Sequence, residues 1–181
     1  MKIIYPLVFL ILAGCAAAPE KLESVGRAES ARLARPTKRF SSYAAYELRP
    51  MVLSEAVKRD EAKVAAAGEL EAVVRAQLRP LLSKWQAARG SERSGTLIIE
   101  PRLESLRIVS VGARFWIGGF AGDSSIDMDL MFTEQSNGQI AKPRITRSAD
   151  AMTGGWSVGQ SDQNLLDYIA SIAYYYMTDN Y

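Results

Sequence analysis

The sequence of 181 residues contains no histidine and a single cysteine, Cys15. Histidine is the commonest general base near neutral pH and the commonest metal ligand. Its absence excludes Ser-His-Asp and Cys-His catalysis and most transition-metal sites, and the lone cysteine excludes an internal disulfide framework. What stays open is chemistry by carboxylate, lysine or tyrosine side chains, calcium binding by oxygen ligands, or no chemistry at all. We expect no cofactor and no metal site.

The sequence also lacks a large excess of charge of either sign, because it has 22 Lys and Arg residues and 20 Asp and Glu residues. This balance gives no electrostatic reason to expect a nucleic-acid partner. The chain is long enough for one domain that buries most of its apolar surface without cross-links.

The first fifteen residues carry the most specific signal. Lys2 precedes an apolar run at 3–12, and Leu12-Ala13-Gly14-Cys15 resembles the lipobox of bacterial lipoproteins. The run is shorter than the roughly 20 residues that span a bilayer, so we expect cleavage of a signal peptide, residues 1–14. An ordinary secretory signal with an incidental cysteine is the alternative.

Resemblance to bacterial lipoproteins implies that Cys15 carries three acyl chains. One chain binds a bilayer only weakly, with an association constant of about 10⁴ M⁻¹, whereas several anchor it stably. By the same resemblance Ala16, in a Gram-negative cell, implies export to the outer membrane. The expected location is therefore the periplasmic face of the outer membrane.

Residues 15–38 have few large apolar side chains and are expected to form a flexible tether. The domain is then residues 39–181, and a chain that begins near Lys38 should fold by itself. A first strand is expected from Phe40 to Pro50. Ser54 is the expected N-cap of a helical stretch that Gly68 divides and Pro80 kinks. Its apolar stripe, spaced by three and four residues, consists of Leu70, Val74, Leu78, Leu81 or Leu82, and Trp85.

Alternating apolar residues predict two longer strands after this stretch. One begins near Thr96, with Pro101 indicating an edge position or a bulge and a change of parity indicating a bulge near Ser105. The other includes Ile126, Met128, Leu130 and Phe132.

The hairpin signal Asn137-Gly138 then leads to a returning strand at 140–148, which Pro143 makes irregular. Ser161 or Asp162 caps a last helix. These elements predict a single α+β domain with an antiparallel-rich sheet of about four strands and helices packed on one face.

Two glycine-containing motifs match known functional patterns only in part. Gly155-Trp156-Ser157-Val158-Gly159 matches the G-x-S-x-G pattern of a nucleophilic serine, but no histidine exists to take its proton. Gly118, Gly119 and Gly122 lack the Lys-Ser/Thr of a phosphate-binding loop, so tight turns explain them better.

Acidic residues offer a third candidate site. Asp127 and Asp129, with Asp123 just before them, lie on one strand face about 7 Å apart, within reach of one calcium ion. The EF-hand pattern is missing, and a solvated polar face is the preferred interpretation.

The strongest binding candidate is the aromatic and glycine-rich stretch at 115–122. Phe115, Trp116 and Phe120 are candidate residues for binding a partner or the membrane surface, with closure of the core as the alternative. Tyrosines of the last helix and tail are a second candidate interface, although simple surface tyrosines are preferred: Tyr168, Tyr174, Tyr175 and Tyr181.

The chain resembles a group of uncharacterised proteobacterial lipoproteins that carry a domain of unknown function. The resemblance lies in the lipobox, the 115–122 stretch, the Asp129 strand, Asn137-Gly138, Gly155-Trp156-Ser157 and the tail from Tyr175 to Tyr181. It implies no catalytic residue.

These observations favour a non-enzymatic, lipid-anchored protein that binds a protein partner in the cell envelope. The alternative is a carrier that binds a lipid or small amphiphile between sheet and helices. A carboxylate-based envelope hydrolase is a third and weaker hypothesis.

Overall fold

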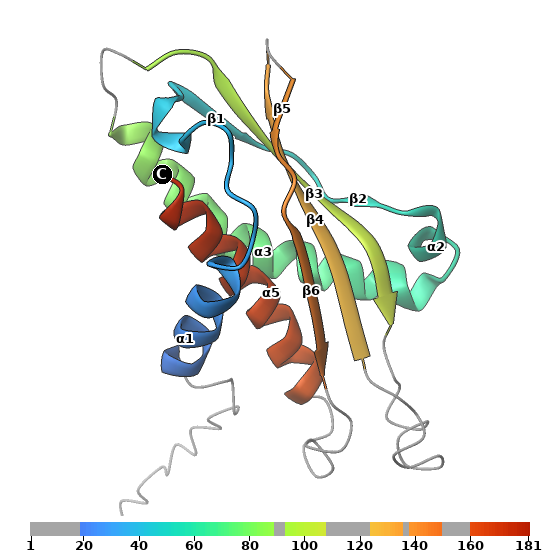
Figure 1. Cartoon of the computed structure of the whole chain (residues 1–181). Helices are drawn as coiled ribbons and strands as arrows, with labels where there is room; N and C mark the ends of the chain where they lie inside the picture. Colours follow the sequence, from blue (N-terminus) through green and yellow to red (C-terminus); the bar gives the residue numbers. More distant parts are fainter. Residues whose placement is uncertain (1–18, 89–92, 108–123, 136–137, 150–159) are drawn as a thin grey trace, which may run out of the picture.

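Two long antiparallel strands form the centre of the structure. The computed structural model describes residues 19–88, 93–107, 124–135, 138–149 and 160–181 (Figure 1). β3, Thr96–Arg107, pairs with β4, Ser124–Glu134, from Leu97 opposite Glu134 to Arg107 opposite Ser125. The register shifts between Leu103 and Ser105, which confirms the predicted bulge.

Shorter strands extend the sheet on both sides. β1, Ala45–Leu48, and β2, Val52–Leu53, run parallel to β3, while β5, Gly138–Ala141, and β6, Arg144–Ala149, run antiparallel to β4. The sheet therefore has six strands and is mixed, whereas we expected about four, mostly antiparallel.

Two prolines account for the larger number of strands. Pro50 separates β1 from β2, and Pro143 separates β5 from β6, because proline has no N–H to give to a strand ladder. The parallel pairing follows from connectivity: helices link β2 to β3, and such a crossover brings the next strand back in the same direction.

Pro101 lies in an inner strand, so the predicted edge position is wrong. Leu130, its partner on β4, directs its N–H away from β3 and donates to the carbonyl of Pro143 at 2.9 Å. The nitrogen of Pro101 consequently faces the other neighbour, at the gap between β1 and β2. The missing N–H of Pro101 therefore lies at a position where neither β1 nor β2 pairs with β3.

One of the predicted helix starts, at Ser54, is confirmed. α2, Glu55–Lys58, has Ser54 as N-cap, whose side chain accepts from the N–H of Val57. α3, Glu61–Ala87, is capped by Asp60 and continues through Gly68 and Pro80, so the predicted division at Gly68 is wrong. The predicted stripe of α3 is buried. The last helix is α5, Gln160–Asp179. Ser161 and Asp162 lie inside it, so the prediction that one of them is its N-cap is wrong.

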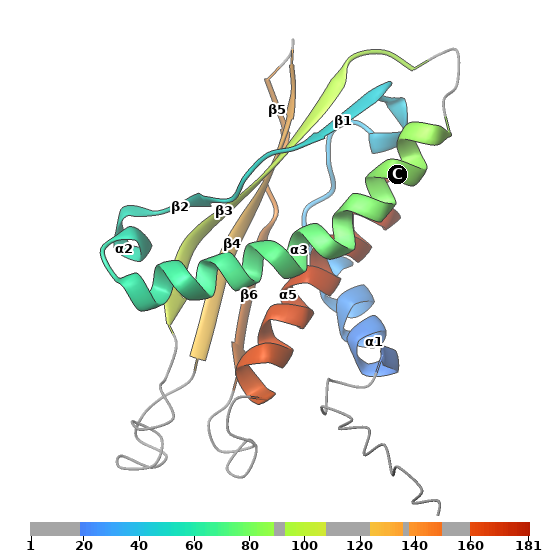
Figure 2. The ribbon, with the colours of Figure 1, turned by 180° about the vertical axis from the view of Figure 1, so that it is seen from behind.

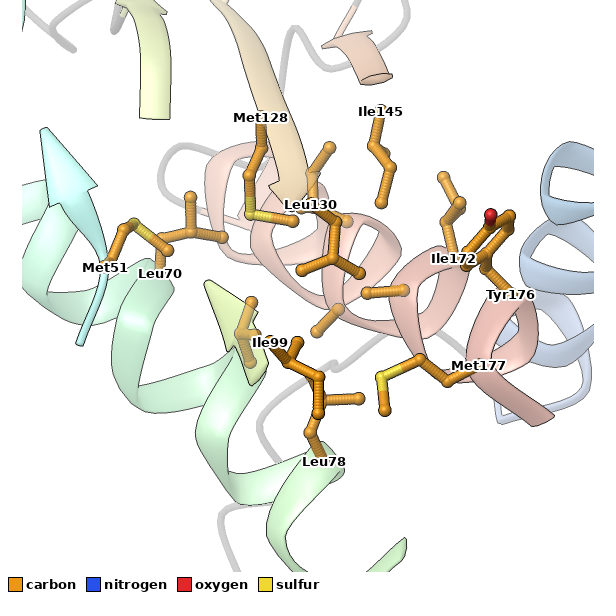
Figure 3. Packing of buried hydrophobic residues seen from close by; sticks show 14 of the residues in the cluster. Met51, Leu70, Leu78, Ile99, Met128, Leu130, Ile145, Ile172, Tyr176 and Met177 are labelled. Atoms are coloured by element: carbon orange, nitrogen blue, oxygen red, sulfur yellow. The ribbon is translucent and has the colours of Figure 1, made fainter. Parts of the chain in front are cut away.

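α3 and α5 cover the same face of the sheet (Figure 2). Their apolar stripes meet the inward side chains of β3, β4 and β6, and Figure 3 shows the packing of Leu78, Ile99, Leu130 and Met177. The predicted single α+β domain with helices on one face is thus confirmed. No helix among the described residues is long and apolar enough to cross a membrane.

The segment expected to be a tether is structured from residue 19 onward. α1, Pro19–Ser30, packs on α5, where the hydroxyl of Ser171 donates to the carbonyl of Leu22 at 2.8 Å. Tyr176 donates to the carbonyl of Ala34 at the same distance. The expectation of a flexible tether at 15–38 is therefore wrong for residues 19–38. Gly26 and Ser30, the buried residues of α1, are small, and its apolar residues Leu22 and Val25 are only half-buried.

Residues 37–43 join the core directly. The N–H of Thr37 donates to the carbonyl of Ile140 at 3.1 Å, and the ring of Phe40 stacks on Phe132 at 4.6 Å between centroids. A short 3₁₀ turn, Phe40–Ser42, stands where a strand was expected to begin. Lys38 forms an ion pair with Glu134 at 3.3 Å.

Candidate functional site

Most of the predicted site residues lie outside the described residues. They are Cys15, the stretch at 115–122 with Phe115, Trp116 and Phe120, Asp123, and Gly155–Gly159. The hypotheses on lipidation and on the aromatic patch stay predictions. Asp127 and Asp129 are described, and they lead to the candidate surface.

Charged side chains of the central strands lie on the sheet face opposite α3 and α5, the face that no helix in the described ranges covers (Figures 1 and 2). Alternation along β4 sends Ile126, Met128, Leu130 and Phe132 into the core, so Asp127 and Asp129 take the other face. Register places Arg102 of β3 and Arg144 of β6 on either side of Asp129. We call this surface the charged sheet face.

Asp129 is the centre of the charged sheet face. Its carboxylate accepts from Nε and Nη2 of Arg144 at 2.6 and 2.9 Å and pairs with Nζ of Lys142 at 2.9 Å. The Asp129 side chain is only 1% exposed, whereas those of Arg144 and Lys142 are 59% and 40% exposed. Hydrogen bonds from Arg144 hold the pKa of Asp129 below its usual value, and the pKa of Arg144 is raised in return.

The break at Pro143 brings these two cations together. Lys142 and Arg144 flank the proline between β5 and β6, and both reach the same carboxylate of β4. The preferred interpretation of Asp129 as a solvated residue is therefore wrong. A buried carboxylate stays charged when cations and hydrogen bonds replace the water that it loses.

Asp127 has a different environment, which does not support a shared calcium ion. It accepts from the hydroxyl of Ser105 at 2.5 Å, while both oxygens of Asp129 are engaged by cations. No group of three or more Asp, Glu, His or Cys residues suited to a metal ion occurs in the described part of the chain. A carboxylate with a lowered pKa is also a weak base. This arrangement suits binding better than proton transfer.

Two further pairs of opposite charge lie on this face. Arg102 forms an ion pair with Glu100 at 2.7 Å, and Arg49 pairs with Glu47 at 3.0 Å. Arg144 uses Nε and Nη2 for Asp129, so further guanidinium donors are left for solvent or a partner. The face thus presents positioned donors and acceptors, with Ile98 and Met131 as half-buried apolar neighbours.

The tyrosines of the last helix and tail are largely used within the chain. Tyr168 and Tyr175 lie under the guanidinium groups of Arg147 and Arg27, at 4.9 and 4.5 Å from the ring centroids. Tyr181 stacks on Trp85 at 4.2 Å. Tyr174, Trp85 and Tyr181 also line an apolar groove of about 390 Å³ between α3 and α5.

A larger groove of about 700 Å³ runs between β1 and the second half of α3. We call it the edge groove. Its walls are Tyr46 and Leu48 from β1 and Arg79, Leu82, Ser83, Gln86 and Ala87 from α3. Gln86 Oε1 accepts from the main-chain N–H of Tyr46 at 3.3 Å, and burial raises the pKa of the Tyr46 hydroxyl to about 12.

Sequence reasoning missed Lys142, Arg144 and Gln86. A signal existed for the first two, because opposite charges on neighbouring antiparallel strands form cross-strand pairs and the hairpin at Asn137-Gly138 made β4 and the returning strand neighbours. Gln86 had no such signal, since its contact with Tyr46 depends on how α3 crosses the sheet.

The fold and the site together define an α+β domain with a charged sheet face that no helix among the described residues covers. No protein-family model matches the sequence, and no curated protein matches it. Among solved structures, it is similar to the PelC L103M dodecamer from Paraburkholderia phytofirmans in space group C2, with a TM-score of 0.42, 12% identity, and coverage of 79% of this chain and 92% of that chain. The PelC dodecamer from the same organism in space group P6 gives a TM-score of 0.41 and 12% identity, with coverage of 79% of this chain and 95% of that chain. At these TM-scores neither likeness carries an argument about function.

Proposed function

We propose that this chain is a lipid-anchored protein on the periplasmic face of the outer membrane that binds a protein partner without catalysing a reaction. The anchor rests on the lipobox at Leu12–Cys15. The observation that carries partner binding is the charged sheet face, where Asp129 is buried yet ionised and its cations Arg144 and Lys142 are held at the surface. Charged groups held in place favour recognition of a complementary surface.

The alternative of an amphiphile carrier has less support. A ligand between sheet and helices needs an apolar cavity there, and the described part of that space is filled by close-packed side chains (Figure 3). Leu70, Leu78, Ile99, Met128 and Leu130 are all fully buried. A hydrolase has less support still, since Asp129 is engaged by its cations and by the hydrogen bonds of Arg144.

A charge-exchange experiment tests the binding face. Glu100→Arg combined with Arg102→Glu keeps an ion pair but reverses its direction on the charged sheet face. Glu71→Arg with Arg75→Glu does the same on α3, where the pair has the same 2.7 Å separation. We expect cross-linking in intact envelopes to recover the partner about tenfold less with the first double variant and equally with the second. Equal recovery with both would show that this face does not bind the partner.

The anchor is tested separately by labelling with a fatty acid. The wild-type chain should incorporate the label, and Cys15→Ser should accumulate as an unlabelled, uncleaved precursor. Absence of label in the wild-type chain would contradict the membrane anchor and leave partner binding to be judged by the charge-exchange experiment.

A further inference from the structure

We propose that the edge groove binds an extended, acidic peptide segment of a partner protein, which adds to β1 as a further strand of the sheet. The proposal rests on the partner-binding function proposed above and names the chemical class of segment that this second surface recognises. Three observations carry it: the direction of the main-chain groups of β1, the shape of the groove, and an arginine without a carboxylate partner.

Within the described part of the chain, no strand pairs with the outer edge of β1. The N–H groups of Ala45 and Arg49 donate to the carbonyls of Gly95 and Ile99 on the β3 side. Since alternate residues point in opposite directions along a strand, the polar groups of Tyr46 and Leu48 point away from β3. No other residue in the described ranges takes the main-chain groups of Leu48 on this side. An unpaired strand edge is a template for another extended chain.

The contact with Gln86 shows that the outward N–H of Tyr46 can bond to an acceptor from outside the sheet. Its side-chain carbonyl accepts from the N–H of Tyr46, in the position that a carbonyl of a neighbouring strand would take. An incoming peptide can supply a backbone carbonyl there and continue the ladder along Leu48. In Figure 2 the second half of α3 approaches β1, so the peptide would lie between strand and helix, with side chains entering the edge groove.

The lining of the edge groove defines the peptide chemistry. Leu48 and Leu82 form an apolar wall, and Arg79 on α3 is exposed. Among the described residues Arg79 has no ion-pair or hydrogen-bond partner, in contrast to Arg75 one turn earlier, which pairs with Glu71. An apolar side chain next to an acidic one on the peptide would complement Leu82 and Arg79.

A second copy of this chain fits the groove less well. Antiparallel pairing of β1 with its own copy would bring both α3 helices to the same side of the joined sheet, each with an unpaired Arg79. Like charges facing one another oppose association, whereas an acidic segment of another protein removes the conflict.

Selection from a library of random octapeptides on the purified mature chain tests this proposal. We expect the selected peptides to share an acidic residue beside an apolar one. Methylation of alternate backbone nitrogens in a selected peptide should abolish its binding, because main-chain hydrogen bonds hold an added strand. Arg79→Glu should weaken binding about tenfold, whereas Lys84→Glu, also exposed on α3, should not.

Amide exchange locates the bound peptide. Peptide binding should slow exchange of the Leu48 N–H, while the Arg49 N–H, already bound to Ile99, serves as the internal control. The proposal would be overturned if selection yields no peptide whose binding depends on Arg79. Protection from exchange that is confined to other strands would overturn it too. Concentration-dependent dimers that protect Leu48 would assign the edge to a second copy instead. The isolated chain needs neither anchor nor charged sheet face, so failure here is distinct from failure of the proposed function.

Discussion

Gly26 of α1 lies directly against the ring of Tyr175 of α5. A Cβ on Gly26 would approach Cδ2 of that ring to 2.5 Å and would also meet the hydroxyl oxygen of Ser171. Arg27, the next residue, places its guanidinium 4.5 Å from the centroid of the same ring. The absence of a side chain at residue 26 therefore sets how closely α1 approaches α5, and with it how the segment that follows Cys15 joins the domain.

Gly26→Ala should destabilise the domain by about 1–3 kcal/mol, since an added methyl in a packed contact forces the neighbours apart. Gly68→Ala is the matched control, because a Cβ there meets no atom within 4 Å. In a helix interior the control should gain about 0.5–1 kcal/mol. Chemical denaturation of both variants measures the difference. Similar stabilities would show that α1 is not held against α5.

Removal of residues 16–37 should lower the melting temperature by more than about 5 °C, because α5 loses the contacts of α1 and Tyr176 loses its acceptor at Ala34. This expectation replaces that of a domain beginning at Lys38. Scanning calorimetry should compare the shortened chain with one that lacks only residues 1–15. Equal melting temperatures would restore the original domain boundary.

Asp129→Asn should cost about 2 kcal/mol at pH 7, because charge-assisted hydrogen bonds from Arg144 are lost. The folded-state pKa of Asp129 lies below its usual value of 3.8. The stabilisation is therefore present above pH 4 and is lost as the pH falls through the folded-state pKa. Melting curves from pH 6 to pH 2.5 should show wild type and variant converging at the acid end.

Asp127→Asn is the control for that titration. Asp127 keeps a hydrogen bond from Ser105 in an exposed setting, so its replacement should change stability by less and leave the acid dependence of the wild type in place. If Asp129→Asn retains the full acid dependence as well, another carboxylate governs it.

The aromatic stretch supplies a prediction that rests on the sequence. If Trp116 and Phe120 form a partner-binding patch, changing both to Ser should keep the melting temperature and abolish partner recovery, since aromatic anchors commonly contribute about 2 kcal/mol or more each. If they are core residues instead, truncation of either one to Ala should lower folding stability by about 3–5 kcal/mol. A large fall in melting temperature would therefore reject the patch.

Local patterns were sufficient for most of the elements. Period-two alternation identified β4, the change of parity after Leu103 located the bulge, and the three-and-four spacing from Leu70 to Trp85 gave the buried side of α3. Such patterns are reliable because each residue's burial follows from the repeat of its own element. Ser54 acts as a cap for an equally local reason, since its side chain bonds to a main-chain N–H three residues away.

Tertiary contacts decided what no local repeat records. Alternation assigned Asp129 to the solvent face, and its burial depends on two cations that the break at Pro143 brings onto its carboxylate. Composition made α1 look like a tether, because its contact with α5 uses small residues whose packing depends on Tyr175 and Ser171, about 150 positions away. The sequence by itself determined which segments are helices and strands and which of their faces are apolar. Only the tertiary structure decided which charges are buried, where α1 docks and which strand edge stays open, because each depends on partners distant in the chain.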